Sequence, residues 1–535
     1  MPKATTQVCC ICGADPKASP SFTALLEPFP ASSSPDIARL LSTNDVPQDA
    51  HIPVIQQIIS GAEERLRALD AYILPLQAAL AQLVQQRADI AEHLREHRAI
   101  LSPVRRVPPE LVCEIFDLST AQSRDRIPPW QLGCISRTWR HYAVEYPPLW
   151  SYLTVPHFDL DENEITACLP ALESQLCRSG TALLDIAWPI DNRSPDSRIL
   201  DLLLPHSNSW RTVAFWPEYD DAVLDWLEPV RSKLDSLQKL QVSPRACRQP
   251  VPDVFTTAPN LHQVRLPSIR LSGGDSPLLY RTFIPVPWKQ ITHYRGDCQF
   301  AQHVEILRSA PNLANCALYG IEYTGSIAAR ETPLVLPQLR RLCLDWDGFL
   351  LPIVASNLEE LCCPYSNWII PRILPFVWRA SCTLQRLILW ECPLSAELTI
   401  TLRDLPSLTY LLLVNGRHDE ADGLAFFATM HVYGTTTDIR PHLKSMVYGY
   451  VHWDSRESHD SFIRMARSRF EASASRPSAT VLNSLRLLSC SRYLGDYSPP
   501  DADFKARIRS LQNERFNVAF LGEGETAEYL RCREF

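Results

Sequence analysis

Glycine is scarce in this chain of 535 residues, which has 17 glycines but 44 prolines. Most globular chains contain more glycine than proline. Proline lacks a backbone N–H and disfavours helix in the residue before it, so we expect short secondary-structure elements. Long apolar runs are also missing: the densest, Leu408 to Val414, is far below the about 18 residues of a transmembrane helix. We therefore expect no membrane span.

Positive charge is in deficit. The chain has 52 Lys and Arg against 60 Asp and Glu, a formal net charge of 52 − 60 = −8. Such a chain has no general electrostatic attraction to nucleic acid or anionic lipid. Residues 1–20 lack a basic start followed by an apolar core, so we expect no secretory signal and a cytoplasmic or nuclear location. The 17 cysteines should then be reduced thiols.

The motifs of common catalytic sites are missing as well. The sequence has no G-x-S-x-G, no G-x-x-x-x-G-K-[ST] and no G-x-G-x-x-G after a strand. Gly522-Glu-Gly524 is acidic and lacks the third glycine of a phosphate-binding loop. We therefore expect that the chain binds no cofactor and is not an enzyme.

Two patterns resemble zinc sites. Cys9, Cys10 and Cys12 include the C-x-x-C spacing of half a site, but no second pair follows at a suitable distance. The sequence from His93 to His97 spells H-x-x-E-H, the inverted zinc-peptidase motif, with two imidazoles on one helical face. A motif with only three fixed positions often arises by chance in charged helices. We therefore expect no metal site and keep a zinc peptidase as an alternative.

Residues 1–50, rich in Ser, Pro and Ala, show no periodicity and are expected to be mostly disordered. Residues 51–101 show the heptad spacing of one long helix with a narrow apolar seam. Pro75 lies inside it and should kink or split the helix. The seam predicts either a homodimer through residues 55–101 or packing on the same chain. Its positions are Ile59, Ala62, Leu66, Leu69, Ile73, Leu76, Leu80, Leu83, Arg87, Ile90, Leu94, His97 and Leu101.

Residues 102–155 should contain two or three short helices. The first begins after an extended entry, because proline costs little at the first helical position, and a carboxylate is favoured near that end. The second is expected from Trp130 to Glu145, with Leu132, Ile135, Trp139 and Tyr142 on one face. A module of this size buries only a small hydrophobic core, and we therefore expect it to pack against a partner or against the next domain. The entry is Val107, Pro108, Pro109 and Glu110, and the apolar face of the first helix is Leu111, Ile115 and Phe116.

The segment from Val107 to about Trp150 resembles the F-box, the helical motif through which substrate receptors dock on the Skp adaptor of SCF ubiquitin ligases. The order of segments is similar to that in a large group of F-box proteins from mushroom-forming fungi: a heptad helix, then Ser-Pro-Val-Arg-Arg, then the F-box. Val107 stands where Leu is commoner, and Ser136 where Cys is usual. The matching residues are Pro108-Pro109-Glu110-Leu111, Ile115-Phe116, Ile135, Arg137, Trp139-Arg140 and Pro148-Leu149-Trp150.

The resemblance implies that this segment binds a Skp-type adaptor and, through it, a cullin. The residues to which it assigns adaptor binding are Val107, Pro108, Pro109, Glu110, Leu111, Ile115, Phe116, Ile135 and Trp139.

Between residues 156 and 495 a weak L-x-x-L-x-L repeat recurs. Most copies start about 25 residues apart, which is typical of leucine-rich repeats. We expect an α/β leucine-rich-repeat-like solenoid with a parallel sheet, capped by residues 496–535; an irregular α/β domain is the alternative. The copies begin at Leu237, Leu261, Leu339, Leu384 and Leu408 and, more loosely, at Trp210, Trp288, Leu313, Leu358, Leu443 and Leu482.

In such a repeat the first, fourth and sixth residues point inward, and those between them form an outward binding surface. Trp390 and Tyr410 could anchor a protein there, since aromatic residues dominate interface energetics, or could be covered by the tail or a loop. The weak candidates for target binding are Arg341, Asp345, Arg386, Trp390 and Tyr410. Other outward positions include Lys239, Gln241, Gln263, Arg265, Glu360 and Leu412.

These features predict a substrate-recognition subunit of an SCF-type ubiquitin ligase, composed of a long helix, a small all-α F-box and a repeat array that binds an unidentified protein. The alternative is a scaffold that binds the adaptor, or dimerises, without ligase function.

Overall fold

In the computed structural model of the chain, the described residues cover most of both compact units, Met1–Val112 and Cys113–Phe535. Cys9, Cys10 and Cys12 lie outside them, as do residues 522–535. The described residues are 34–121, 128–155, 162–190, 196–217, 225–242, 253–266, 285–298, 300–320, 332–364, 369–415, 420–431, 443–450, 456–475, 482–489, 502–513 and 517–521.

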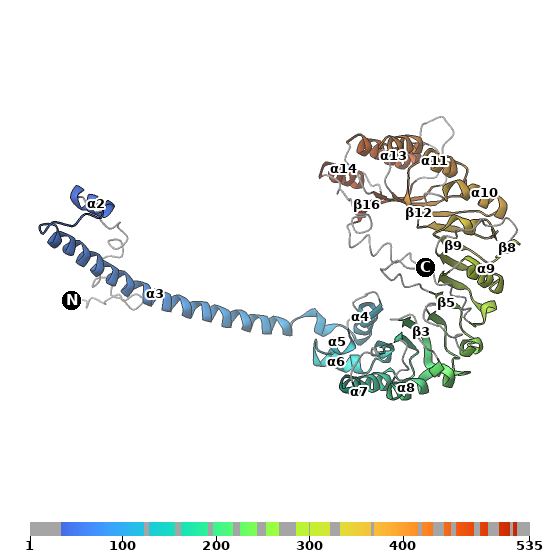
Figure 1. Cartoon of the computed structure of the whole chain (residues 1–535), viewed down its shortest axis with the longest axis horizontal. Helices are drawn as coiled ribbons and strands as arrows, with labels where there is room; N and C mark the ends of the chain where they lie inside the picture. Colours follow the sequence, from blue (N-terminus) through green and yellow to red (C-terminus); the bar gives the residue numbers. More distant parts are fainter. Residues whose placement is uncertain are drawn as a thin grey trace, which may run out of the picture. The chain divides into compact units, whose positions relative to one another are not determined.

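The first unit is dominated by α3 (Ile52–Ile100), a single helix of 49 residues that confirms the predicted long N-terminal helix (Figure 1). Pro75 does not split α3, because losing one backbone hydrogen bond leaves the turns on either side intact. A short helix, α2 (Pro35–Ser42), lies in the segment expected to be mostly disordered. The 3₁₀ turn η1 (Pro103–Arg106) follows α3.

Helix α4 (Pro109–Ala121) crosses the boundary between the units, and α5 (Pro129–Leu132), α6 (Arg137–Val144) and η2 (Pro147–Trp150) follow. The single helix predicted from Trp130 to Glu145 is therefore two helices. Ser136 causes the break: its backbone is extended, and its side chain accepts a hydrogen bond from the N–H of Trp139 at 3.1 Å. A serine in this position caps α6, and it is exposed rather than buried.

The second unit is built on one sheet of 14 parallel strands whose spatial order follows the chain, with β8 and β10 forming a separate pair. This order is that of a solenoid and excludes an irregular α/β domain. The strands are β1 (Tyr152–Thr154), β2 (Leu184–Ile190), β3 (Trp210–Pro217), β4 (Lys239–Val242), β5 (Gln263–Leu266), β6 (His293–Asp297), β7 (Asn315–Tyr319), β8 (Leu334–Val335), β9 (Arg341–Leu344), β10 (Ile353–Val354), β11 (Glu360–Cys363), β12 (Arg386–Cys392), β13 (Tyr410–Asn415), β14 (Ser445–Tyr450), β15 (Ser484–Ser489) and β16 (Val518–Leu521).

Helices and 3₁₀ turns connect the strands and cover one face of the sheet (Figure 1). Their apolar side chains join those of the strands in one continuous core. The connecting elements are α7 (Glu162–Ser179), α8 (Ser197–Leu203), η3 (Leu204–Ser209), η4 (Asp225–Val230), η6 (Asp253–Thr257), η7 (Trp288–Gln290), α9 (Phe300–Ser309), η8 (Asp347–Leu350), α10 (Ile370–Ala380), α11 (Ala396–Arg403), α12 (Glu420–Met430), α13 (Arg456–Ser475) and α14 (Ala502–Asn513).

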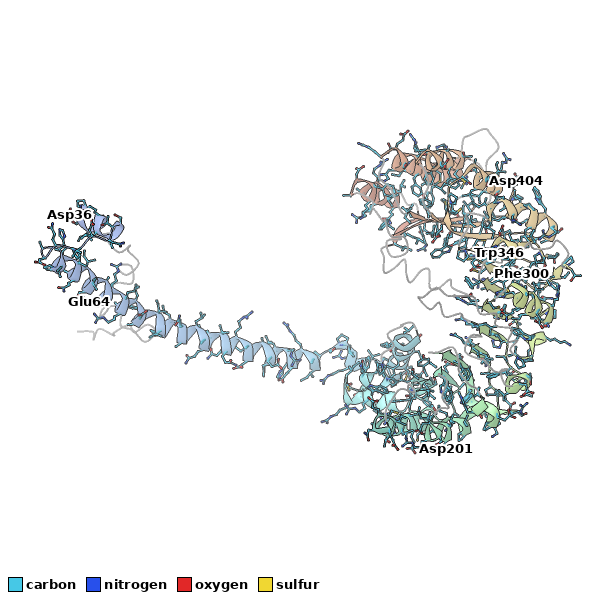
Figure 2. All side chains as sticks on the ribbon, viewed as in Figure 1. Asp36, Glu64, Asp201, Phe300, Trp346 and Asp404 are labelled. Atoms are coloured by element: carbon cyan, nitrogen blue, oxygen red, sulfur yellow. The ribbon has the colours of Figure 1, made fainter. Side chains whose placement is uncertain are left out.

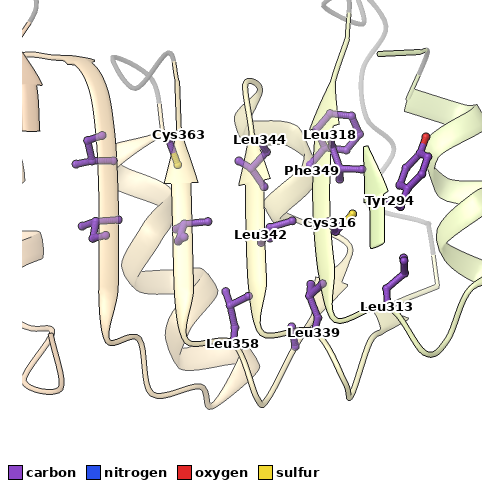
Figure 3. Packing of buried hydrophobic residues seen from close by; sticks show 14 of the residues in the cluster. Tyr294, Leu313, Cys316, Leu318, Leu339, Leu342, Leu344, Phe349, Leu358 and Cys363 are labelled. Carbon is purple, nitrogen blue, oxygen red and sulfur yellow. The ribbon is translucent and has the colours of Figure 1, made fainter. Parts of the chain in front are cut away.

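Equivalent residues of successive repeats stack in rows beneath the sheet. Leu313, Leu339 and Leu358 form one such row, and Cys316 pairs in register with Leu342 in the next (Figure 3). Each repeat thus buries its apolar residues only against its neighbours, as expected of a repeat array.

One repeat was assigned to the wrong phase. Tyr294 pairs with Val264, the fourth residue of its repeat, so this copy begins at Ile291 and not at Trp288. Trp288 belongs to η7, where it is buried in the same core and packs edge-on against Tyr294, with ring centroids 5.8 Å apart. Trp288 and Ile291 are both apolar and both buried, so the sequence pattern alone could not show which of them begins the repeat.

The sheet begins earlier and ends later than predicted. Strand β1 lies inside residues 102–155, and β16, inside residues 496–535, extends the sheet beyond the helix α14. The indole N–H of Trp150 donates to the carbonyl of Ala143 at 2.6 Å, and Gln175 Nε2 donates to the carbonyl of Tyr152 at 2.6 Å. The end of the expected F-box is therefore continuous with the first repeat.

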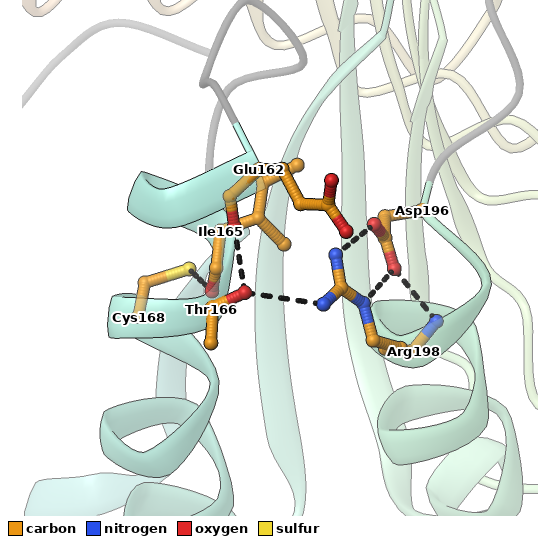
Figure 4. Close-up of polar contacts among 6 residues, drawn as sticks. All are labelled: Glu162, Ile165, Thr166, Cys168, Asp196 and Arg198. Carbon is orange, nitrogen blue, oxygen red and sulfur yellow. Dashed lines mark hydrogen bonds and ion pairs between the residues drawn. The ribbon is translucent and has the colours of Figure 1, made fainter.

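Helices α7 and α8 are joined by polar contacts around Arg198 (Figure 4). Asp196 caps α8 by accepting from the N–H of Arg198 at 2.8 Å, and its carboxylate pairs with the same guanidinium. Arg198 also donates to the hydroxyl of Thr166 at 3.2 Å. Hydrogen bonding to Arg198 lowers the pKa of the Asp196 carboxyl. These partly buried contacts orient α8.

Candidate docking and binding surfaces

Helix α4 exposes an apolar stripe on one side. Leu111 is 52% exposed, Ile115 41% and Leu118 56%, and their spacing of four and three residues places them on one helical face. Val112 and Phe116 are buried on another face. The prediction that Leu111, Ile115 and Phe116 share a face is wrong for Phe116, because five residues is almost one and a half helical turns from Leu111.

Phe116 belongs to the core of the small helical region. Its ring packs edge-on against Trp139 at 5.4 Å between centroids, and Tyr146 donates to the carboxylate of Asp117 at 2.7 Å. Burial, and to a smaller extent the hydrogen bond to Asp117, raise the pKa of Tyr146 to about 12. The hydroxyl therefore stays protonated and remains a donor. These contacts tie α4 to the segment around α6. Phe116 and half-buried Trp139 therefore pack beneath the exposed stripe and do not belong to it.

The other predicted adaptor-binding residues are accessible. Val107 is half-buried, whereas Pro108, Pro109 and Glu110 at the start of α4 are exposed. Ile135, between α5 and α6, is exposed as well. Four exposed apolar residues of this region were missed: Val104, Leu118, Trp130 and Val144. The i, i+4, i+7 spacing from Leu111 was the signal that could have identified Leu118.

On the face of the sheet away from the connecting helices, four adjacent strands contribute a chain of polar contacts. Glu360 is 5% exposed and accepts from two arginines: Arg341 Nη2 at 3.0 Å and Arg386 Nε at 2.7 Å. The guanidinium of Arg386 lies over the ring of Tyr410, 4.0 Å from its centroid. In-register pairing of β9, β11, β12 and β13 creates this chain. Two cations face one carboxylate there.

Farther along the sheet this face is buried, which favours the second of the two alternatives for Trp390 and Tyr410 over exposed anchors. Tyr410 and Leu412 belong to a second apolar cluster, so neither is an exposed anchor. Trp390 is half-buried against the same cluster. Asp345, on β9's C-terminal side, accepts from the N–H of Gly320 at 3.2 Å. The cluster comprises Ile388, Tyr410, Leu412, Val414, Val447 and Leu488.

Sequence reasoning also missed a buried polar cluster behind β6. His303 is fully buried on α9: its Nδ1 lies 3.0 Å from the hydroxyl of Tyr294, and its Nε2 lies 2.9 Å from the carbonyl of Tyr319 and 3.5 Å from the thiol of Cys298. A carbonyl only accepts, so Nε2 carries the proton and Nδ1 accepts from Tyr294. Gly296 makes room, because a Cβ there would collide with Tyr294 and His303.

This histidine and cysteine do not form an activated pair. Burial lowers the pKa of His303 to about 4 and raises the pKa of Cys298 to about 12. A nucleophilic cysteine needs the opposite shift, toward a thiolate beside an imidazolium. The cluster is therefore a neutral hydrogen-bonded network within the core.

The buried His303 predicts a pH-dependent stability. Its pKa is about 4 in the folded chain, against 6.5 as the ordinary value, so the unfolded state binds more protons between these pH values. Above pH 6.5 the titration of His303 does not affect the free energy of unfolding. As the pH drops from 6.5 toward 4, it lowers this free energy by about 3 kcal/mol. His303→Gln, which can keep one donor and one acceptor, should flatten this dependence in urea titrations. His141→Gln, at an exposed position, should not; equal pH profiles for both variants would contradict the prediction.

The H-x-x-E-H sequence does not form a metal site in the described structure. His93 and His97 are exposed on α3, and His97 Nδ1 lies 2.8 Å from the carbonyl of His93. Among the residues that are described, no group of three or more His, Cys, Asp or Glu side chains could hold a metal ion. The described helices also include none that is long and apolar enough to cross a membrane.

Comparisons with known proteins identify no family. No protein-family model and no curated protein matches this sequence. Solved structures do match, among them an internalin from Listeria monocytogenes, at 12% identity and a TM-score of 0.28 over 65% of this chain and 88% of that one.

Proposed function

We propose that this chain is the substrate-recognition subunit of an SCF-type ubiquitin ligase. Helix α4 and its surroundings dock on a Skp-type adaptor, and the open face of the sheet binds a target protein. The observation that carries the proposal is the exposed apolar stripe of Leu111, Ile115 and Leu118, in the segment whose motifs resemble the F-box.

Physical chemistry supports a partner for this stripe. Three large aliphatic side chains on one helical face remain accessible while Val112 and Phe116 on the other side are buried. Burying one such side chain is worth roughly 1.5–3 kcal/mol, so covering all three is a substantial driving force for association.

In this proposal the target protein binds to the part of the sheet that remains accessible. Lys239 is exposed and Gln241, Arg265, Arg341 and Arg386 are half-buried on that face. These side chains are polar and mainly basic, which favours a target segment with acidic groups. The chain performs no chemistry in this proposal; it raises the local concentration of a target lysine near the ubiquitin carrier.

Copurification distinguishes the ligase subunit from a scaffold. From cells of its own source, the tagged chain should copurify with both a Skp-type adaptor and a cullin, because the adaptor bridges the two. Leu111→Asp should lose both proteins together. Recovery of the adaptor without a cullin would favour the scaffold that binds the adaptor without ligase function.

A further inference from the structure

Helix α3 leaves most of its apolar seam exposed, with Ala62 and Leu69 half-buried. None of its 49 residues is buried. Figure 2 shows its side chains projecting along the whole length of the helix. At 1.5 Å per residue the helix is about 73 Å long, and an unpacked helix in water draws little stability from propensity alone. The exposed large apolar residues of the seam are Ile59, Leu66, Ile73, Leu76, Leu80, Leu83, Ile90 and Leu94.

The seam has the heptad pattern of a coiled coil, with apolar residues at most positions a and d. Positions a are Ile59, Leu66, Ile73, Leu80, Arg87, Leu94 and Leu101, and positions d are Ala62, Leu69, Leu76, Leu83, Ile90 and His97. Because α3 is continuous through Pro75, all of these up to His97 lie on one uninterrupted helix, with Leu101 directly after it. The apolar layers run without a break from Ile59 to Leu83, and both polar positions fall in the C-terminal third.

We infer that α3 pairs with α3 of a second copy of this chain as a parallel, in-register coiled coil. This inference is independent of the proposed ligase function, since it uses other residues. It would give each assembly two adaptor-docking helices and two repeat arrays.

The polar seam positions select this partner and this register. In a parallel pair Arg87 meets Arg87 and His97 meets His97 of the second copy, while every other layer is apolar. In an antiparallel pair that overlaps along the whole seam, or in a shifted parallel pair, each of them lies against an apolar residue, such as Leu69 opposite Arg87. A single polar residue at position a is known to specify register in this way, at a cost in stability.

Charge complementarity favours the same arrangement. Arg65 occupies a position g and Asp70 the following position e. In a parallel pair, residues g and e of the two helices flank the seam and attract each other when their charges are opposite. The arrangement places Arg65 of each copy beside Asp70 of the other.

Light scattering of the full chain tests the pairing. The expected mass is twice the 60.6 kDa of one chain at micromolar concentration. Leu80→Asp, at a seam position that is 62% exposed, should weaken dimerisation at least about a hundredfold, because it places two carboxylates together in an apolar seam. Leu74→Asp is the matched control: this leucine is 65% exposed on the same helix but outside the seam, and its replacement should leave the dimer intact.

Two further variants test register and orientation. Leu69→Cys should form a covalent dimer under mild oxidation beyond that of the unmodified chain, because the two residues face each other only in the parallel register. In an antiparallel pair they would be about 27 Å apart, at 18 residues' separation. Arg87→Leu should tighten dimerisation at least about tenfold by removing the one charged layer.

The inference is overturned by a monomeric wild-type chain at tens of micromolar, by equal effects of Leu80→Asp and Leu74→Asp, or by a dimer in which Leu69→Cys adds no cross-link. None of these outcomes affects adaptor binding through α4, so failure of the dimer and failure of the proposed ligase function can be told apart.

Discussion

Leu111→Asp should weaken binding of a purified Skp-type adaptor at least about a hundredfold. Leu111 is half exposed on α4, so a complex that covers it gains about half of the roughly 1.5–3 kcal/mol that full burial of a leucine is worth. An aspartate adds the cost of removing an unpaired carboxylate from water. Since each 1.4 kcal/mol is a factor of ten, the loss amounts to two decades or more. Titration calorimetry or a quantitative pull-down measures it.

The variant should fold normally, because Leu111 is not part of a buried core. Leu351→Asp is the control: another exposed leucine, far from α4 in the sequence, whose replacement should leave adaptor affinity unchanged. Ile115→Asp, one turn along the same stripe, should reproduce the loss. Full adaptor binding by both α4 variants, with native circular dichroism, would remove the main support for the proposed function.

Trp188→Ala should lower the free energy of unfolding of the repeat unit by about 4 kcal/mol. Trp188 is fully buried on β2, with its ring centroid 4.4 Å from that of Trp226 and 6.1 Å from those of Trp210 and Phe215. Removing the indole leaves a cavity among large aromatic side chains that can relax only in part. Urea denaturation followed by far-ultraviolet circular dichroism gives the difference.

Trp378→Ala provides the comparison for this measurement. Trp378 lies on α10 and is exposed, so the same substitution there should change the free energy of unfolding by less than about 0.5 kcal/mol. Equal destabilisation by the two variants would mean that the aromatic cluster at β2 and β3 does not support the array. Because each repeat contacts only its neighbours, unfolding should begin among the first strands in Trp188→Ala.

The sequence by itself determined the long helix, the positions of most strands and the residues that point into the core. Each of these depends on a local period, seven residues in α3 and the L-x-x-L-x-L pattern in the strands, which the backbone geometry converts directly into a face or a row. The inward residues Leu240, Leu342, Leu387 and Leu411 were found in this way. The period failed at Trp288, where two apolar residues three positions apart both fit.

The tertiary structure alone decided which apolar and polar groups are accessible. Phe116 and Leu111 are both large and apolar, but Phe116 is buried against Trp139 whereas Leu111 is half exposed on another face of α4. Tyr410 alternates outward as predicted and is nevertheless buried in a second apolar cluster. His303 meets Tyr294 and Cys298 only because α9 packs behind β6, which no spacing in the sequence encodes. Periodicity specifies the direction of a side chain from its own backbone, whereas burial depends on what the rest of the chain places in front of it.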